Sequence, residues 1–379
     1  MDGSIPFWMY ILGFPLLLGP LVTLHELGHY LVGRWFGVQA EAFSVGFGKE
    51  LYGWTDKRGT RWKLSALPLG GYVQFKGDMN PASIPDAEAN TQASPAERDG
   101  SFHHAALWKR ALIVFAGPAT NIIVTLAIFA AFFLALGRPV PADPVEQLTI
   151  SAFSEQSTAR EAGLQAGDRI VSVEGRKMES FFDLRRAVML YPGRTLAMTV
   201  EREGNMRQFA VPVAAIEDTD QFGNKSKIGL IGVMPAAAGF DFKAVGPVNA
   251  VGLAVDETIS IAKMMGTGIV QIFTGERSVK ELGGPVTIGK VAGEQLSLGW
   301  RDFVNFAALI SLNLAFINLL PIPALDGGHL AFYAAEAIRR KPVGPRGQEV
   351  AYRAGVALVL MLMIFVTIND LAKLPIFGK

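Results

Sequence analysis

Two histidines and a glutamate near the N-terminus form the pattern His25-Glu26-Leu27-Gly28-His29. On a helix, residues four apart lie on one face, so the imidazoles of His25 and His29 can bind one metal ion. Neutral imidazole suits Zn²⁺, and the carboxylate of Glu26 can accept a proton from a water that attacks a carbonyl. The residue types therefore predict metal-assisted hydrolysis of an amide.

This motif lies inside an apolar run from Phe7 to Phe36, which is long enough to cross a membrane. The start of the chain lacks the basic region of a cleavable signal peptide, so we expect the run to be a retained span. Histidine and glutamate are costly at bilayer depth and usually mark a functional site that faces the protein interior. The position of the motif thus favours a functional centre within the membrane.

Two further apolar runs carry polar residues. The run from Ala111 to Leu136 contains a Gly-Pro break and Asn121, for which helix packing and a place in the site are both open. The run from Phe303 to Leu320 continues into Asn318-Leu319-Leu320-Pro321-Ile322-Pro323-Ala324-Leu325-Asp326-Gly327-Gly328-His329. Because prolines break helices, Asp326 is placed as an ionisable residue at the membrane and is the natural third metal ligand. Helix capping is the alternative for Asp326, and His329 could bind the metal or be structural.

Composition restricts the class of protein. The 379 residues are 50% hydrophobic with a mean hydropathy of +0.30, which is typical of a membrane protein with a soluble portion. The net charge is +1 and no basic block with interleaved aromatic residues occurs, so nucleic acid is excluded as a partner. The absence of cysteine excludes disulfides and thiolate ligands, and any zinc must be held by histidine and carboxylate.

Two stretches between the spans predict β structure. Residues from Phe43 to Phe75 alternate around a turn at 56–59 and predict a hairpin, in which Gly70 and Gly71 would allow close backbone approach. Residues 148–216 predict a small α+β domain. Its strands are expected at Ile170–Val173, Leu196–Val200 and Gln208–Val213, with a helix near Phe182–Leu190.

The remaining segments set the topology. Val248–Phe273 has helical spacing but carries three charged residues, so residues 217–300 are expected to be an interfacial, amphipathic region. A fourth span is predicted at Gly355–Ile368. Four spans place one set of basic residues on the same side, which the positive-inside rule makes cytoplasmic: Arg34, Lys109, Arg110, Arg339, Arg340, Lys341, Arg346 and Arg353. The 148–216 domain and both termini would then lie outside.

These motifs resemble two known families. Residues 162–170, followed by Val173-Glu174-Gly175, resemble the signature of PDZ domains, which capture extended peptides by strand addition. A peptide-binding role and a lid that restricts access are both open for this domain. The order H-E-L-G-H, G-P-A-x-N, PDZ insertion and N-x-x-P-x-P-x-L-D-G-G resembles the site-2 protease family of intramembrane zinc metalloproteases. Within that family it resembles the bacterial regulator-of-sigma-E protease group, although this chain has room for one PDZ domain where some members carry two.

The resemblance implies a polytopic α-helical protein of a bacterial inner membrane, with membrane cores at 1–140 and 301–379 and the active site near the cytoplasmic side. It implies that His25, His29 and Asp326 bind Zn²⁺ and that Glu26 is the general base. It also implies that the hairpin is a membrane-reentrant sheet. The substrate would be positioned by Asn318, Asn121, Gly70 and Gly71. The expected substrates are single-span membrane proteins, such as anti-sigma factors or signal-peptide remnants, cleaved in regulated intramembrane proteolysis. The alternative is a noncatalytic membrane scaffold that gathers partners through its PDZ domain.

Overall fold

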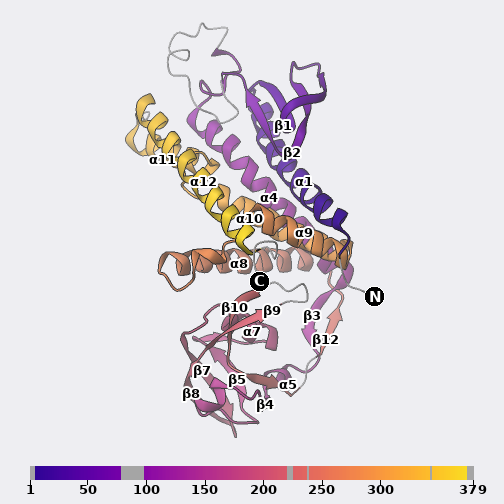
Figure 1. Ribbon diagram of the computed structural model, residues 1–379, viewed down its shortest axis with the longest axis vertical. Coiled ribbons are helices and arrows are strands. Elements are labelled where there is room, and N and C mark those ends of the chain that lie inside the picture. Colours follow the sequence, from indigo (N-terminus) through magenta and orange to yellow (C-terminus); the bar gives the residue numbers. More distant parts are fainter. Residues whose placement is uncertain (1–4, 78–97, 220–224, 237–238, 342–343, 374–379) are drawn as a thin grey trace. The chain divides into compact units, whose positions relative to one another are not determined.

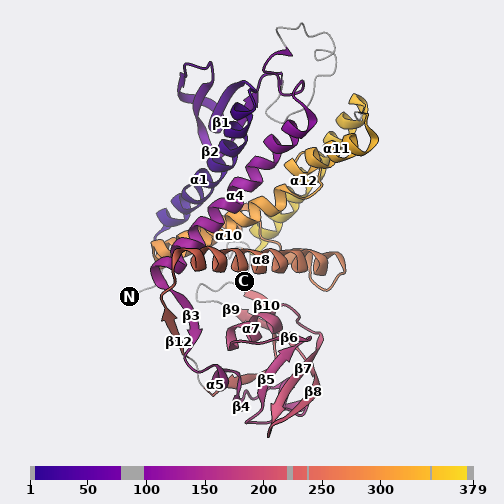
Figure 2. The ribbon, with the colours of Figure 1, turned by 180° about the vertical axis from the view of Figure 1, so that it is seen from behind.

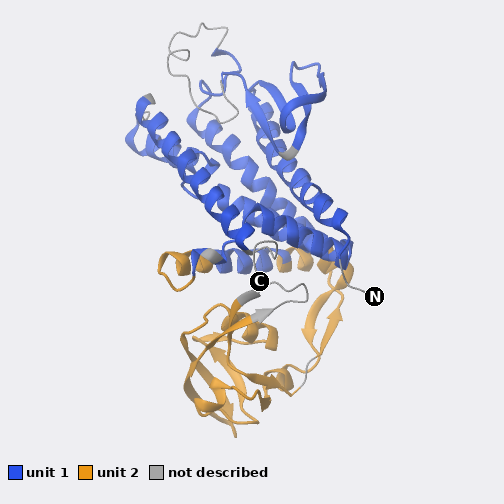
Figure 3. Cartoon of the chain, in the orientation of Figure 1, with its two compact units in different colours: residues 1–130, 254–265, 278–379 blue, residues 131–253, 266–277 orange. Residues whose placement is uncertain are grey.

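The computed structural model describes residues 5–77, 98–219, 225–236, 239–341 and 344–373 (Figure 1). It divides into two compact units, one of residues 1–130, 254–265 and 278–379 and the other of residues 131–253 and 266–277 (Figure 3).

Among the described residues, four helices are long and apolar enough to cross a membrane, as predicted. They are α1 (Phe7–Trp35), α4 (Leu107–Leu136), α10 (Trp300–Asn318) and α12 (Pro345–Lys373). The last helix begins at Pro345 rather than at the predicted Gly355. Its first turns carry Arg346 and Arg353, so the apolar run in the sequence marks only the later part of the helix. Between α10 and α12 lies α11 (Asp326–Arg339), which starts after the predicted proline break.

The first unit also contains a helix that the sequence analysis did not predict, α9 (Pro285–Leu298), preceded by the 3₁₀ turn η1 (Val279–Glu281). It packs against α1, α10 and α12. A Cβ atom added to Gly13 would lie 2.8 Å from the backbone nitrogen of Gly293, so the glycines allow direct backbone contact between α1 and α9. The buried carboxylate of Asp370 accepts hydrogen bonds from the backbone N–H groups of Gly284 and Thr287 at the start of α9.

The predicted hairpin consists of β1 (Ala40–Thr55) and β2 (Arg61–Phe75), seen from behind in Figure 2. The two long strands curl into a small sheet. Residues 42–45 pair with residues 61–64 on one side and with residues 71–74 on the other, while residues 50–55 pair with residues 61–65. Residues 71–75 are therefore at an edge of this sheet. The turn is held by the carboxylate of Asp56, which accepts hydrogen bonds from the backbone N–H groups of Arg58 and Thr60.

The second unit contains an α+β domain. A four-stranded sheet has the order β6-β5-β7-β8, and its buried side chains form a continuous core with helix α7. The bounds of its elements are α5 (Pro144–Leu148), β4 (Ile150–Phe153), α6 (Thr158–Glu161), β5 (Arg169–Val173), β6 (Arg176–Lys177), α7 (Phe181–Met189), β7 (Thr195–Arg202) and β8 (Asn205–Pro212). The strands and the helix expected from the sequence agree with β5, β7, β8 and α7.

The predicted domain boundary at residue 216 is too early. After β9 (Ala214–Thr219) and β10 (Lys225–Leu230), strand β11 (Val233–Pro235) returns to pair with β4, and Ile231 is 3% exposed within the domain core. This pairing joins strands about eighty residues apart, so no local pattern signals it. The chain then forms β12 (Phe240–Lys243), which pairs with β3 (Arg138–Pro141), and the residues predicted to begin an interfacial region are instead strands.

Helix α8 (Pro247–Phe273) covers the predicted amphipathic segment. Ala250, Ala254, Thr258 and Ile261 are buried along one stripe at helical spacing, whereas Asp256 is exposed. The helix is not among the four that meet the length and hydropathy requirement for a span. Its pattern is that of an amphipathic helix, and its place at a membrane interface stays a prediction.

Candidate active site

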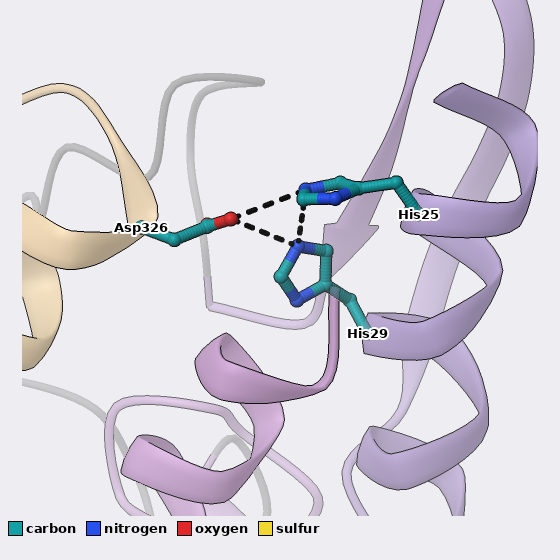
Figure 4. Close-up of side chains that lie close together, drawn as sticks. All are labelled: His25, His29 and Asp326. Carbon is teal, nitrogen blue, oxygen red and sulfur yellow. Dashed lines mark hydrogen bonds and ion pairs between the residues drawn. The ribbon is translucent and has the colours of Figure 1, made fainter. Parts of the chain in front are cut away.

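The three predicted metal ligands converge, and every residue of the site belongs to the first unit (Figure 4). His25 and His29 lie on successive turns of α1, and their Nε2 atoms are 3.2 Å apart. The Oδ2 atom of Asp326 lies 3.1 Å from His25 Nε2 and 3.6 Å from His29 Nε2. Both histidines are buried, at 7% and 8% exposure. The arrangement presents two ring nitrogens and one carboxylate oxygen to a common point.

Asp326 reaches this point because the chain after α10 is folded tightly. Pro321 and Pro323 end the helix, and Ala324 adopts a left-handed conformation with a φ of +86°. A Cβ atom on Gly327 would lie 2.2 Å from the carbonyl oxygen of Leu320. Only glycine fits there, so the first turn of α11 packs directly on the proline-containing loop. Asp326 occupies that first turn, and its Oδ2 atom faces the histidines.

Helix α4 supplies the wall behind the histidines through residues at four-residue spacing. The Nδ1 atom of His29 donates a hydrogen bond of 2.8 Å to the carbonyl of Ile113. One turn later, a Cβ atom on Gly117 would lie 2.2 Å from His29 Nε2 and 2.7 Å from His25 Nε2. One turn further, the side-chain amide of Asn121 lies 3.2 Å from His25 Nδ1. Sequence reasoning noted the Gly-Pro break but did not assign Gly117 to the site; its spacing from Asn121 was the available signal.

A cavity of about 270 Å³ opens beside the three ligands. Glu26 lines it, and the Oε2 atom of Glu26 accepts a hydrogen bond of 3.2 Å from the backbone N–H of Val73 on β2. A Cβ atom on Gly71 would lie 2.6 Å from the carbonyl oxygen of Ser44, so a glycine is needed where the sheet edge passes the site. The edge of the sheet and the base predicted from the sequence thus share one cavity.

The other predicted site residues fall into two groups. Asn318 and His329 line the same cavity, and Asn318 is the last residue of α10. His329 is not part of the cluster of metal-ligating groups found among the described residues. Gly70 is not among the cavity-lining residues; it has a φ of +147°, and a Cβ atom there would collide with the ring of Phe47.

The donor set fits zinc. Two imidazoles and one carboxylate are ligands of catalytic zinc sites, in which a fourth position is left for water or substrate. The Oδ2 atom of Asp326 is buried and has no hydrogen-bond partner among the described residues, which a metal ion would satisfy. The missing side chain at Gly117 leaves space in front of both ring nitrogens. His25, His29 and Asp326 would hold the ion.

Residues 13–362 match the model of peptidase family M50. The chain belongs to peptidase family M50. It is therefore a multi-pass membrane peptidase of the M50 family, with zinc as its metal cofactor.

Full-length relatives extend this result. A protein of Agrobacterium fabrum, named as a candidate zinc metalloprotease, is 45% identical over 367 residues, which are 96% of each chain. A Brucella suis protein with the same kind of name is 46% identical over 363 residues, covering 95% of this chain and 94% of its own. The metalloprotease MmpA of Caulobacter vibrioides is 32% identical over 396 residues, covering 98% of both.

Among solved structures, the PDZ domain of the SdrC-like protein of Listeria monocytogenes covers 24% of this chain and 87% of its own length, at 18% identity and a TM-score of 0.19.

Proposed function

We propose that this M50 peptidase cleaves the transmembrane segments of single-span membrane proteins within the bilayer, as a step of regulated intramembrane proteolysis. One observation carries the proposal: two of the three metal ligands and Glu26 lie on α1, a helix long and apolar enough to cross a membrane. A peptidase acting only on soluble chains has no need to place its ligands on such a helix.

A substrate helix hides its peptide bonds in intrahelical hydrogen bonds, so it must unwind locally before hydrolysis. The sheet edge at residues 71–75 could stabilise the unwound segment, because Gly71 and Val73 on this edge line the cavity beside Glu26. An added strand would form main-chain hydrogen bonds with this edge. We propose that Gly71 lets the substrate backbone approach and that Asn318 receives a freed carbonyl. Gly70 acts indirectly, by giving the ring of Phe47 space beside the edge.

The chemistry needs a polarised carbonyl and a deprotonated water. Zinc, when bound, supplies the Lewis acidity that polarises the carbonyl and makes water more acidic. Glu26 lines the cavity beside the ligands and would accept the proton of the attacking water, then transfer it to the leaving nitrogen. The Val73 N–H holds the Glu26 carboxylate in place for both transfers.

The site is expected near the cytoplasmic face of a bacterial inner membrane. Arg34 lies in the last turn of α1, soon after the histidines. With four spans, the basic residues around Arg110 and Arg339 are expected on the same side of the membrane as Arg34, and the positive-inside rule makes that side cytoplasmic. The α+β domain of the second unit would then be periplasmic. We propose that it is a PDZ-like domain that either binds an extended peptide or limits access to the site.

The proposal is tested by mapping the cleaved bond. The purified chain is reconstituted into vesicles with a single-span reporter that carries cleavable sequence both in its apolar segment and in its soluble flanks, and the fragments are sequenced by mass spectrometry. We expect cleavage inside the apolar segment. Introducing helix-breaking residues into that segment should increase the rate, because less energy is needed to unwind it.

Two results would contradict the proposal. Cleavage confined to the soluble flanks would show that the enzyme does not act within the membrane. Cleavage that is the same in a Glu26→Gln variant would show that Glu26 is not the base of the reaction.

A further inference from the structure

Asn121 is the most completely enclosed polar residue of the site. Its exposed fraction is 0%, and its side-chain Nδ2 atom lies 3.2 Å from His25 Nδ1. The Oδ1 atom is buried and has no hydrogen-bond partner in the described part of the chain. Its backbone is fixed as well, because the carbonyl of Asn121 accepts a hydrogen bond of 2.9 Å from Ser311 on α10. Among the described residues, the ring of His25 is the one polar group within hydrogen-bonding distance of this amide.

The two histidines differ in the group behind them. His29 donates its Nδ1 proton to the carbonyl of Ile113, which fixes the lone pair on the Nε2 atom that faces His25 and Asp326. In the part of the chain that the structure describes, no carbonyl accepts a hydrogen bond from the His25 ring, whose Nδ1 atom meets the Asn121 amide instead. The side-chain amide of asparagine carries an NH₂ donor and a carbonyl acceptor. Rotation of the amide group by 180° exchanges the positions of these two groups.

We propose that Asn121 is a metal-ligand positioning residue. When a metal ion occupies the lone pair of His25 Nε2, the ring proton must be on Nδ1, and the amide oxygen of Asn121 accepts it. When the ring carries its proton on Nε2, the amide nitrogen donates to Nδ1 instead. Asn121 therefore holds the ring of His25 in one orientation in both forms, and metal binding selects the oxygen-inward amide.

We propose this role for Asn121 in place of the substrate-positioning role expected from the sequence. Asn121 and Asn318 both line the cavity, but Asn121 is 0% exposed and its amide lies 3.2 Å from His25 Nδ1, so it is placed to act through that ligand. The inference rests on the zinc site alone and not on the nature of the substrate. Zinc affinity can be measured without any substrate, so its failure is separate from a failure of intramembrane cleavage.

The experiment compares two variants at this position. Asn121→Leu keeps a similar volume but removes the hydrogen bond, and Asn121→Asp keeps only acceptors. Zinc affinity of the purified full chain is measured by competition with a chromogenic chelator, and the visible spectrum of the cobalt-loaded protein reports the geometry of the site. We expect Asn121→Leu to bind zinc about 10- to 100-fold more weakly, with an altered cobalt spectrum, and Asn121→Asp to bind as tightly as the wild type.

Ser311→Ala is the matched control, because it removes a hydrogen bond to the same residue without touching His25. It should leave zinc affinity and the cobalt spectrum unchanged. Wild-type zinc affinity in Asn121→Leu, with an effect limited to KM, would overturn the proposal in favour of substrate contact. Equal loss of zinc in the Leu, Asp and Ser311→Ala variants would overturn it in favour of a packing role.

Discussion

The substitution Gly117→Ala tests the close fit between α4 and the metal ligands. The added Cβ atom would lie 2.2 Å from His29 Nε2, whereas ordinary contacts begin at 3.4 Å, an overlap of about 1.2 Å. Ligand positions in metal sites tolerate shifts of only about 0.2 Å, so the overlap is enough to displace a ligand. We expect zinc affinity to fall at least about 100-fold, or about 2.8 kcal/mol at 1.4 kcal/mol for each factor of ten.

The assay is chelator competition on the purified chain, with thermal unfolding followed on the same samples. Gly19→Ala is the matched control, because it lies within α1 and a Cβ atom there meets nothing within 4 Å. That change should leave zinc binding unaffected and stabilise the helix by about 0.5–1 kcal/mol. Wild-type zinc affinity in folded Gly117→Ala protein would refute the argument that this glycine makes space for the ligands.

Three further predictions follow from single interactions. Asp370→Leu removes the carboxylate that accepts hydrogen bonds at the start of α9. Thermal unfolding should therefore show that the free energy of unfolding falls by about 2–3 kcal/mol. An unchanged Tm would argue against this cap. Burial disfavours the charged form of Asp168, but hydrogen bonds from Arg202 and from a backbone N–H outweigh it and lower the pKa of Asp168. Since a lowered carboxyl pKa stabilises the fold above the ordinary value of 3.8, Asp168→Asn should destabilise the α+β domain at neutral pH. Limited proteolysis would measure the difference in domain stability between the variant and the wild type. That difference should vanish as the pH falls well below 3.8, and a difference that persists there would contradict the assignment. Removal of zinc by a chelator should abolish cleavage, and added zinc should restore it; cleavage by metal-free protein would be inconsistent with the site.

The spacing of His25 and His29 and the ionisable Asp326 after two prolines were sufficient to predict the cluster, because each signal is local. Helical periodicity places the first two on one face, and a carboxylate beside a membrane span needs a partner. The same reasoning could not assign Gly117. Its importance lies in the side chain it lacks, and that is visible only once α4 is packed against α1.

Helix α9 and strand β11 were missed for related reasons. Helix α9 is short, rich in small residues and only moderately apolar, and its contact with α1 depends on Gly13 and Gly293 meeting across the interface. Strand β11 is three residues long and is stabilised by pairing with β4, far away in the sequence. Neither sequence periodicity nor local secondary-structure propensity predicts such contacts. Long apolar helices and alternating strands, in contrast, carry their own pattern and were predicted.

The central claim is that His25, His29 and Asp326 hold zinc and that Glu26 handles the proton beside it. The most direct measurement determines zinc content and the cleavage rate of a single-span reporter in Glu26→Gln protein alongside wild type. The account predicts the same zinc content in both, with cleavage reduced by about 100-fold or more in the variant. Wild-type cleavage by zinc-loaded Glu26→Gln protein would contradict it.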